Sequence, residues 1–155
     1  MRAAVLEEFG APLEVQELEL SEPRTGEALV RLEACGVCHT DLYTASGADP
    51  SGYAPTVLGH EGAGIVERVG DGVSHVAVGD HVVLSTLGNC GACAACDSGK
   101  PTHCRTSFGK LSRPFTWQEK KTFQFANTGV FSEATVVKGR QAVPISKDVP
   151  WASAS

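Results

Sequence analysis

The sequence predicts a mainly β domain: a small β-barrel with short peripheral helices and one inserted metal lobe. Three observations support this prediction. Short segments of alternating apolar and polar residues recur along the chain, which is typical of strands with one buried face. The 17 glycines and 8 prolines among 155 residues supply the many turns that such strands need. Four cysteines lie together in one glycine-rich stretch. The length suits one domain, expected over residues 1–155.

The expected strands follow one another with turn residues between them. In the segment 27–36, apolar residues occupy every second position from 28 to 34, so they fall on one face. Gly62 and Gly64, just before apolar residues at 65, 66 and 69, indicate a close approach of two backbones. Strands are expected at 2–9, 13–20, 27–36, around 65–69, at 82–84, and twice within 131–145.

Two segments are predicted to be helical. Residues 35–47 lack the alternation of a strand; Thr40 and Asp41 suit the start of a short helix, and Gly47 suits its end. Near the end of the chain, Pro150 stands close to the first position of a second helix. Few residues follow it, too few for a helix that is stable alone. We therefore expect the chain to be a fragment of a longer polypeptide.

Residues 106–129 combine aromatic and basic side chains, a mixture that can bind single-stranded nucleic acid. The net charge of −5 at pH 7 disfavours that interpretation and favours a hairpin or loop packed against the cysteine lobe. The side chains concerned are Phe108, Phe115, Trp117, Phe123 and Phe125, with Lys110, Arg113, Lys120 and Lys121.

The composition restricts the class of protein. Apolar residues make up 42% of the chain, as in globular domains, and no apolar run is long enough to cross a bilayer. The first residues, MRAAVLEEF, resemble a strand more than a secretory signal. With six cysteines and no sign of export, the sequence predicts a cytoplasmic protein with reduced thiols. Neither a membrane nor a nucleic acid is expected as a partner.

The cysteine-rich stretch is predicted to bind a structural zinc ion. Its pattern is Cys-x2-Cys-x2-Cys-x7-Cys, and zinc takes four sulfurs at about 2.3 Å in a tetrahedron. A disulfide framework is the alternative, but cysteines three residues apart pair poorly across one tight turn. The lobe is expected at about 88–110, with Gly88, Gly91 and Gly99 allowing its tight turns. The ligands are Cys90, Cys93, Cys96 and Cys104.

A second group of metal-binding residue types lies upstream. Cys38 begins the run Cys-His-Thr-Asp, and His60 and Glu61 follow a glycine some twenty residues later. A catalytic zinc needs three protein ligands and one open position, so a thiolate and an imidazole alone do not complete a site. A buried free cysteine and an unrelated histidine remain the alternative.

Several motifs resemble those of zinc-dependent medium-chain alcohol dehydrogenases. Residues 59–73 (GHEGAGIVERVGDGV) resemble the family signature, and residues 34–41 (ACGVCHTD) resemble its first catalytic motif. The four-cysteine lobe is similar to the family's structural zinc site in spacing and order, and residues 131–145 resemble the closing strands of the family's catalytic domain. The resemblance implies that residues 1–155 are the GroES-like catalytic domain, nearest to the class III branch. It also implies a homo-oligomer for the complete protein.

The resemblance implies a role for each matching residue. Cys38 and His60 would bind the catalytic zinc, and Glu61 would lie close enough to coordinate it transiently. Asp41 would accept a hydrogen bond from the far nitrogen of His60 and fix its tautomer. Thr40 would hydrogen-bond the alcohol oxygen and start a proton relay.

The same comparison places His39 near the pyrophosphate of the cofactor, NAD or NADP, at a helix start suited to anions. Zinc and the nicotinamide would then interconvert an alcohol and an aldehyde by hydride transfer. Cys35 is expected to be a small buried thiol without a role. His75, His81 and His103 are expected to be solvated or locally bonded.

Two departures from the family pattern bear on activity. Tyr43 stands where a histidine often ends the proton relay, so the proton would leave by water or another route. The third zinc ligand of the family, a cysteine in a Gly-Cys motif, would follow residue 155. No Gly-x-Gly-x-x-Gly occurs, so the Rossmann cofactor domain is also expected to be missing from this chain. We therefore expect the isolated chain to be inactive.

The substrate is less well specified. Residues 44–53 resemble the class III branch, which oxidises thiol adducts of formaldehyde. That branch has an acidic residue where Ser51 stands, and a basic residue where Ser107 and Phe108 lie, although Arg105 is near. A glutathione carboxylate would lose a charge partner. A primary or aromatic alcohol, or another thiol adduct, is as well supported.

Two functional hypotheses follow. The first is the zinc and substrate half of an NAD(P)-dependent alcohol dehydrogenase, active when joined to its cofactor domain. The second is a stand-alone zinc-stabilised binding module without turnover. They differ in what the coding sequence should contain beyond residue 155: a Gly-Cys and a glycine-rich nucleotide loop, or a stop codon.

Overall fold

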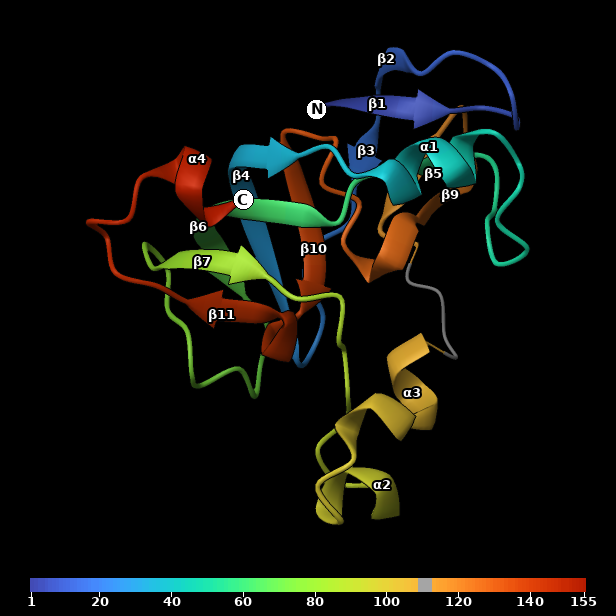
Figure 1. Ribbon diagram of the computed structural model, residues 1–155. Helices are drawn as coiled ribbons and strands as arrows, with labels where there is room; N and C mark the ends of the chain where they lie inside the picture. The colour runs from blue at the N-terminus through green and yellow to red at the C-terminus, as the bar shows by residue number, and fades with distance from the viewer. Residues whose placement is uncertain (109–112) are drawn as a thin grey trace.

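The computed structural model describes residues 1–108 and 113–155. Eleven strands in these ranges form two sheets that together make a barrel-like body, as predicted (Figure 1). Residues 109–112, including Lys110 and the end of the predicted zinc lobe, lie outside the described residues. In the described part of the chain, no helix has both the length and the apolar character needed to cross a membrane.

The six-stranded sheet has the order β2-β1-β5-β9-β8-β3. Its neighbours are antiparallel except for the pair β5 and β9. Strand β2 lies at the edge and pairs only with β1, which leaves Val15 70% exposed despite its apolar alternation. The strands are β1 (Arg2–Leu6), β2 (Glu14–Glu17), β3 (Glu19–Leu20), β5 (Thr56–Val57), β8 (Phe115–Trp117) and β9 (Lys120–Gln124).

The five-stranded sheet is antiparallel throughout, with the order β10-β4-β6-β7-β11. Strands β4 and β6 form its centre, and Gly64 lies directly against the carbonyl of Arg31 on the neighbouring strand, where a Cβ would collide. This confirms the close backbone approach predicted at Gly64, whereas Gly62 makes room for the Val130 side chain. The strands are β4 (Glu27–Gly36), β6 (Glu61–Val69), β7 (His81–Leu84), β10 (Ala134–Lys138) and β11 (Ala142–Pro144).

Two hydrophobic clusters fill the barrel, and the ring of Phe131 packs against both. One is built around Val30, Val66 and Val82 of the five-stranded sheet. The other contains Phe115 and Trp117, so two of the aromatic residues of the segment 106–129 belong to the core, while Phe123 and Phe125 are half-buried. Strands β8 and β9 form the predicted hairpin, but the hairpin is part of the barrel sheet and does not simply cover the metal lobe.

The helical segments are all short and peripheral. Helix α1 covers the segment predicted from Thr40 and Gly47, and α4 begins after Pro150 and lies against β4 and β6. The cysteine lobe, with α2 and α3, projects from the sheets (Figure 1). The segments are α1 (His39–Ala45), α2 (Ala94–Asp97), η1 (Pro101–His103), α3 (Arg105–Phe108), η2 (Phe125–Asn127), η3 (Gly139–Gln141) and α4 (Trp151–Ala154).

Candidate functional site

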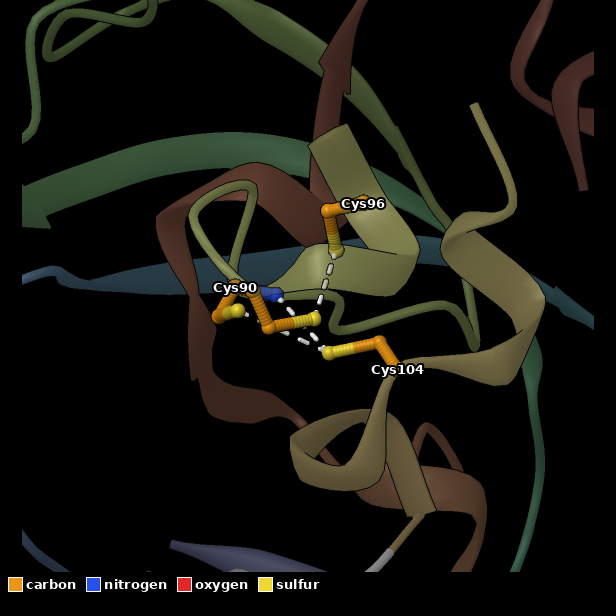
Figure 2. Close-up of side chains that lie close together, drawn as sticks. Cys90, Cys96 and Cys104 are labelled. Carbon is orange, nitrogen blue, oxygen red and sulfur yellow. Dashed lines mark hydrogen bonds between the residues drawn. The ribbon is translucent and has the colours of Figure 1, made fainter. Parts of the chain in front are cut away.

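The structure brings the four lobe cysteines into one cluster, with every sulfur within 4.8 Å of the others. Cys93 Sγ lies 3.5 Å from Cys96 Sγ, and Cys90 Sγ lies 3.7 Å from Cys104 Sγ. A tetrahedron with metal–sulfur bonds of about 2.3 Å has sulfurs about 3.8 Å apart, so the spacing fits a zinc ion. In Figure 2 the labelled side chains of Cys90, Cys96 and Cys104 turn toward one another.

Local backbone geometry produces this cluster. Gly91 (φ 73°) and Gly99 (φ 76°) adopt left-handed conformations that let the chain wrap around the sulfurs, as their positions predicted. Cys93 precedes the first residue of α2, which carries Cys96 one turn later. The described cysteines are all free thiols, so the disulfide alternative is not seen in this arrangement.

Hydrogen bonds around Cys104 and Cys90 favour thiolates, the form that binds metal. The pKa of the Cys93 thiol is raised, because the Cys96 amide that lowers it is outweighed by the Cys96 thiol and by burial. The hydroxyl of Thr106, 3.2 Å from Cys104 Sγ, and then the amide of Cys90 lower the pKa of the Cys104 thiol to about 5. The amide of Ala92 donates to Cys90 Sγ and lowers the pKa of that thiol as well. The donor set, its spacing and its electrostatics therefore suit a tetrahedral thiolate site.

The second group also converges: Cys38, His60 and Glu61 place one ligand atom each within 4.8 Å of the others. The pairing of β4 with β6 explains this, because Gly36 at the end of β4 lies opposite Glu61 at the start of β6. Cys38 lies two residues after Gly36, and His60 lies one residue before Glu61, so the pairing of the two strands places Cys38 near His60. A Cβ at Gly36 would collide with the Glu61 carboxylate, so the glycine makes room for that side chain.

Asp41 joins the two segments that carry these ligands. Its buried carboxylate accepts the amide of Cys38 (3.0 Å) through Oδ2 and the amide of Gly59 (3.0 Å) through Oδ1. Oδ1 also lies 3.5 Å from His60 Nδ1, a buried nitrogen that has no hydrogen-bond partner among the described residues. The carboxylate is therefore placed to orient the imidazole, although the contact is longer than an ordinary hydrogen bond.

A cavity of about 310 Å³ opens beside this group. Thr40, whose Oγ1 accepts a hydrogen bond from the Cys38 thiol at 3.4 Å, forms part of its wall. Phe125, another wall residue, meets the His60 ring edge to face at 5.5 Å between centroids. The remaining lining is Asp49, Ser51, Tyr53, Thr56, Phe123, Gln124, Ala126 and Asn127.

His39 begins α1 and is exposed, and the described contacts do not connect it with the cavity. Tyr43 is also exposed. The expectation for Cys35 is wrong: it is exposed, because β10 ends opposite Arg31 and leaves the last part of β4 without a neighbour on that side. Partial burial of its sulfur, and then the Asp41 charge, raise the pKa of the Cys35 thiol.

The remaining histidines behave nearly as expected. His75 Nε2 lies 2.9 Å from the carbonyl of Gly139, and His103 is exposed. His81 differs, because its ring packs on Trp151 at 4.3 Å and its buried Nδ1 has no hydrogen-bond partner in the described ranges. Sequence reasoning missed Asn127 and treated Phe125 only as part of an aromatic segment; the mixed composition of residues 106–129 was the available signal.

Comparisons with known proteins agree with this geometry. Residues 24–147 match the model of the alcohol dehydrogenase GroES-like domain. The chain is 45% identical to an S-(hydroxymethyl)glutathione dehydrogenase of Synechocystis, covering 88% of this chain and 39% of that protein. It is 41% identical to an alcohol dehydrogenase class-3 of Dictyostelium discoideum, and that match covers 96% of this chain and 41% of that protein.

A solved benzyl alcohol dehydrogenase from Acinetobacter calcoaceticus has the same fold, with a TM-score of 0.84 and 38% identity. The superposition covers 97% of this chain and 42% of that protein. This chain thus spans about two fifths of the length of these relatives.

Proposed function

Because this chain belongs to the alcohol dehydrogenase family with a GroES-like domain, we propose that it is the zinc- and substrate-binding half of a nicotinamide-dependent alcohol dehydrogenase. One observation carries the proposal: Cys38, His60 and Glu61 converge beside a cavity whose wall includes Thr40. A purely structural module has no need of a second metal-binding group next to a cavity.

Cys38 Sγ and an imidazole nitrogen of His60 would hold the catalytic zinc. Since Nδ1 faces the Asp41 carboxylate, Nε2 is the nitrogen left for coordination. A catalytic zinc takes three protein ligands and keeps one position open. Glu61 is the third candidate within reach in this chain, and a cysteine from the rest of the protein would replace it in the family pattern. The four lobe cysteines would hold a second, structural zinc.

When bound, zinc would supply the Lewis acidity that lowers the pKa of an alcohol and polarises an aldehyde. The hydroxyl of Thr40 is placed to take the alcohol proton and pass it on toward solvent, where Tyr43 offers no imidazole relay. In the complete enzyme, Thr40 would carry the alcohol proton away and a nicotinamide, when bound, would supply the hydride acceptor, so an alcohol would give an aldehyde and a hydroxymethyl thiol adduct a formyl thioester. The nicotinamide, and the pyrophosphate that His39 would meet, would be bound by the cofactor domain that the family resemblance implies for the complete protein.

The cavity supports a primary alcohol with a polar or aromatic end, including a hydroxymethyl thiol adduct. Tyr53 and Phe123 stack at 4.7 Å and offer an apolar surface. Asp49, in the cavity wall, supplies a carboxylate two residues before Ser51, the position at which the class III branch has an acidic residue. The hydroxyl and then the amide of Ser51 lower the pKa of Asp49, so the carboxylate is ionised at neutral pH and suits a substrate amino group.

The test uses the complete protein encoded by the gene, with NAD⁺ or NADP⁺ and two substrates: S-hydroxymethylglutathione and benzyl alcohol. We expect turnover of at least one, and its loss in Cys38→Ser and Thr40→Ala, while Thr25→Ala, an exposed loop substitution, stays active. We expect no turnover from residues 1–155 alone. A gene that ends at residue 155, with a protein that binds one zinc per chain and shows no turnover, would instead establish the stand-alone module.

The six thiols, all free, suit a reducing compartment, and we infer a cytoplasmic location for the complete enzyme. Assembly into a homo-oligomer is also proposed for the complete enzyme, on the family resemblance alone.

A further inference from the structure

The turn η2 forms one wall of the substrate cavity in an unusual conformation. Ala126 (φ 51°) and Asn127 (φ 57°) are both left-handed, a region that side-chain-bearing residues rarely adopt and that asparagine tolerates best. Both residues line the cavity, and Phe125 at the start of the turn meets the His60 ring. Something outside the turn must hold it in this shape, because its own backbone does not favour it.

The side chain of Asn127 connects this wall to the cysteine lobe. Its Nδ2 donates to the carbonyl of Ser107 at 3.1 Å in a buried position. Ser107 lies in α3, and its amide donates to the carbonyl of Cys104 at 3.0 Å. A continuous series of hydrogen bonds therefore runs from a metal-binding cysteine to the cavity wall.

The lobe end of this series is itself fixed to the barrel. Lys138 Nζ donates to the carbonyl of Gly88 (2.8 Å), just before the first cysteine, and to that of Thr106 (2.7 Å), just after the last. The Thr106 hydroxyl in turn contacts Cys104 Sγ. On the barrel side, Gln141 Nε2 donates to the carbonyls of Asn127 (3.3 Å) and Ser85 (2.9 Å).

We propose that the four-cysteine lobe fixes the wall of the substrate cavity, with Asn127 as the positioning residue that connects them. A metal at the lobe would hold Cys104 in place. Cys104 holds α3 through the Ser107 amide, and the Ser107 carbonyl accepts the Asn127 amide and so holds η2. Loss of the metal would release α3 and allow Ala126 and Asn127 to leave the left-handed region. This inference depends on the proposed function only for the identity of the cavity's occupant.

Hydrogen–deuterium exchange on the zinc-loaded chain tests the connection without any turnover. The reporters are the amides of Thr128 and Gly129, which donate to the carbonyl of Phe125 and close the turn. In Asn127→Asp, which keeps the size and the left-handed tolerance but loses the donor, we expect these amides to exchange about tenfold faster at unchanged zinc content. Chelation of zinc should increase the exchange rates of these two amides in the parent chain and increase them little further in the variant.

Two further variants separate the loss of the Asn127 side-chain amide from a general effect of changing an amide to a carboxylate. Asn127→Gly keeps the left-handed backbone and removes the amide, so it should behave as Asn127→Asp does. Gln118→Glu makes the same amide-to-carboxylate change at an exposed, left-handed turn position between β8 and β9, away from the lobe and η2, and should leave the reporters unchanged. If Asn127→Gly exchanges like the parent chain, or if chelation opens residues 90–104 while η2 stays protected, the proposal is wrong.

If removal of zinc unfolds the whole chain, the proposal is tested by comparing the exchange rates of the reporter amides in zinc-loaded Asn127→Gly and in the zinc-loaded parent chain. In the complete enzyme, Asn127→Asp should raise KM several-fold with little change in kcat, because the wall and not the reacting groups is displaced. Failure of the proposed dehydrogenase activity would leave the exchange results valid, so the two proposals can fail separately.

Discussion

The carboxylate of Asp41 lies 3.5 Å from Nδ1 of His60 and also accepts the amides of Cys38 and Gly59. One buried side chain therefore sets the relative position of both segments that carry the candidate ligands. The arrangement explains how a helix start and a strand start, far apart in the sequence, present a thiol and an imidazole to one point.

Asp41→Asn should weaken metal binding at the Cys38–His60 site. The substitution removes the charge that orients and polarises the imidazole, and loss of such an outer partner typically costs about 10- to 100-fold in affinity. Cobalt titration of the complete protein, followed by its thiolate absorption, measures the change. Asp71→Asn, at an exposed turn, is the matched control, and equal affinities of the two variants would contradict the assigned role.

Cys93→Ala should open the lobe and leave the barrel folded. Neither hydrophobic cluster contains a residue of the segment 88–107, so barrel packing does not depend on the metal. Limited proteolysis should cut within the lobe while a resistant barrel remains, with less zinc bound. Cys35→Ala removes a cysteine that belongs to neither metal group and should change neither quantity. Unchanged protease resistance in Cys93→Ala would disprove the prediction.

Lys138→Met should destabilise the junction between lobe and barrel. The ammonium group bonds two carbonyls that flank the cysteines, and a hydrogen bond to a charged group contributes about 2 kcal/mol. We expect the free energy of unfolding of the lobe to fall by about 2 kcal/mol. This quantity is measured from the hydrogen exchange of the lobe amides at a series of urea concentrations. Lys147→Met, at an exposed position, should be neutral. Equal effects of both variants would mean that the contact is not stabilising.

The ion pair between Arg2 and Glu133 should make stability depend on pH. The amide of Arg2 and then its guanidinium lower the pKa of Glu133 below its usual 4.5 in the folded protein. The stabilisation is therefore present above that value and is lost as the pH falls through the lower, folded-state pKa.

Glu133→Gln should accordingly be less stable than the parent chain at pH 7, with the difference shrinking as the pH falls below 4.5 and through the lower pKa of the folded protein. Because both side chains are largely exposed, we expect a small effect that salt reduces. Thermal melts over a pH series measure it, with Glu8→Gln as the exposed control. A difference that grows on acidification would have the wrong sign.

Much of the fold and of the candidate site could be predicted from local patterns. The spacing of Cys90, Cys93 and Cys96 requires only a tight turn, and the glycines at 91 and 99 provide it. The strand at 27–36 follows from alternation, and the glycine at 64 predicts its close neighbour. The limits of alternation appear at Val15, which is exposed because β2 is an edge strand, and at Cys35, where β10 ends too early to cover it.

Which residues have metal-binding chemistry can be read from the chain alone, because ligand type and short spacing are local properties. Which of them meet follows only from the folded arrangement. The register of β4 against β6 carries Cys38 to His60, and the route of the chain after the hairpin brings Asn127 to the carbonyl of Ser107. Such contacts join residues about twenty positions apart or more, and no local pattern encodes them, since they depend on how complete sheets pack around a shared core.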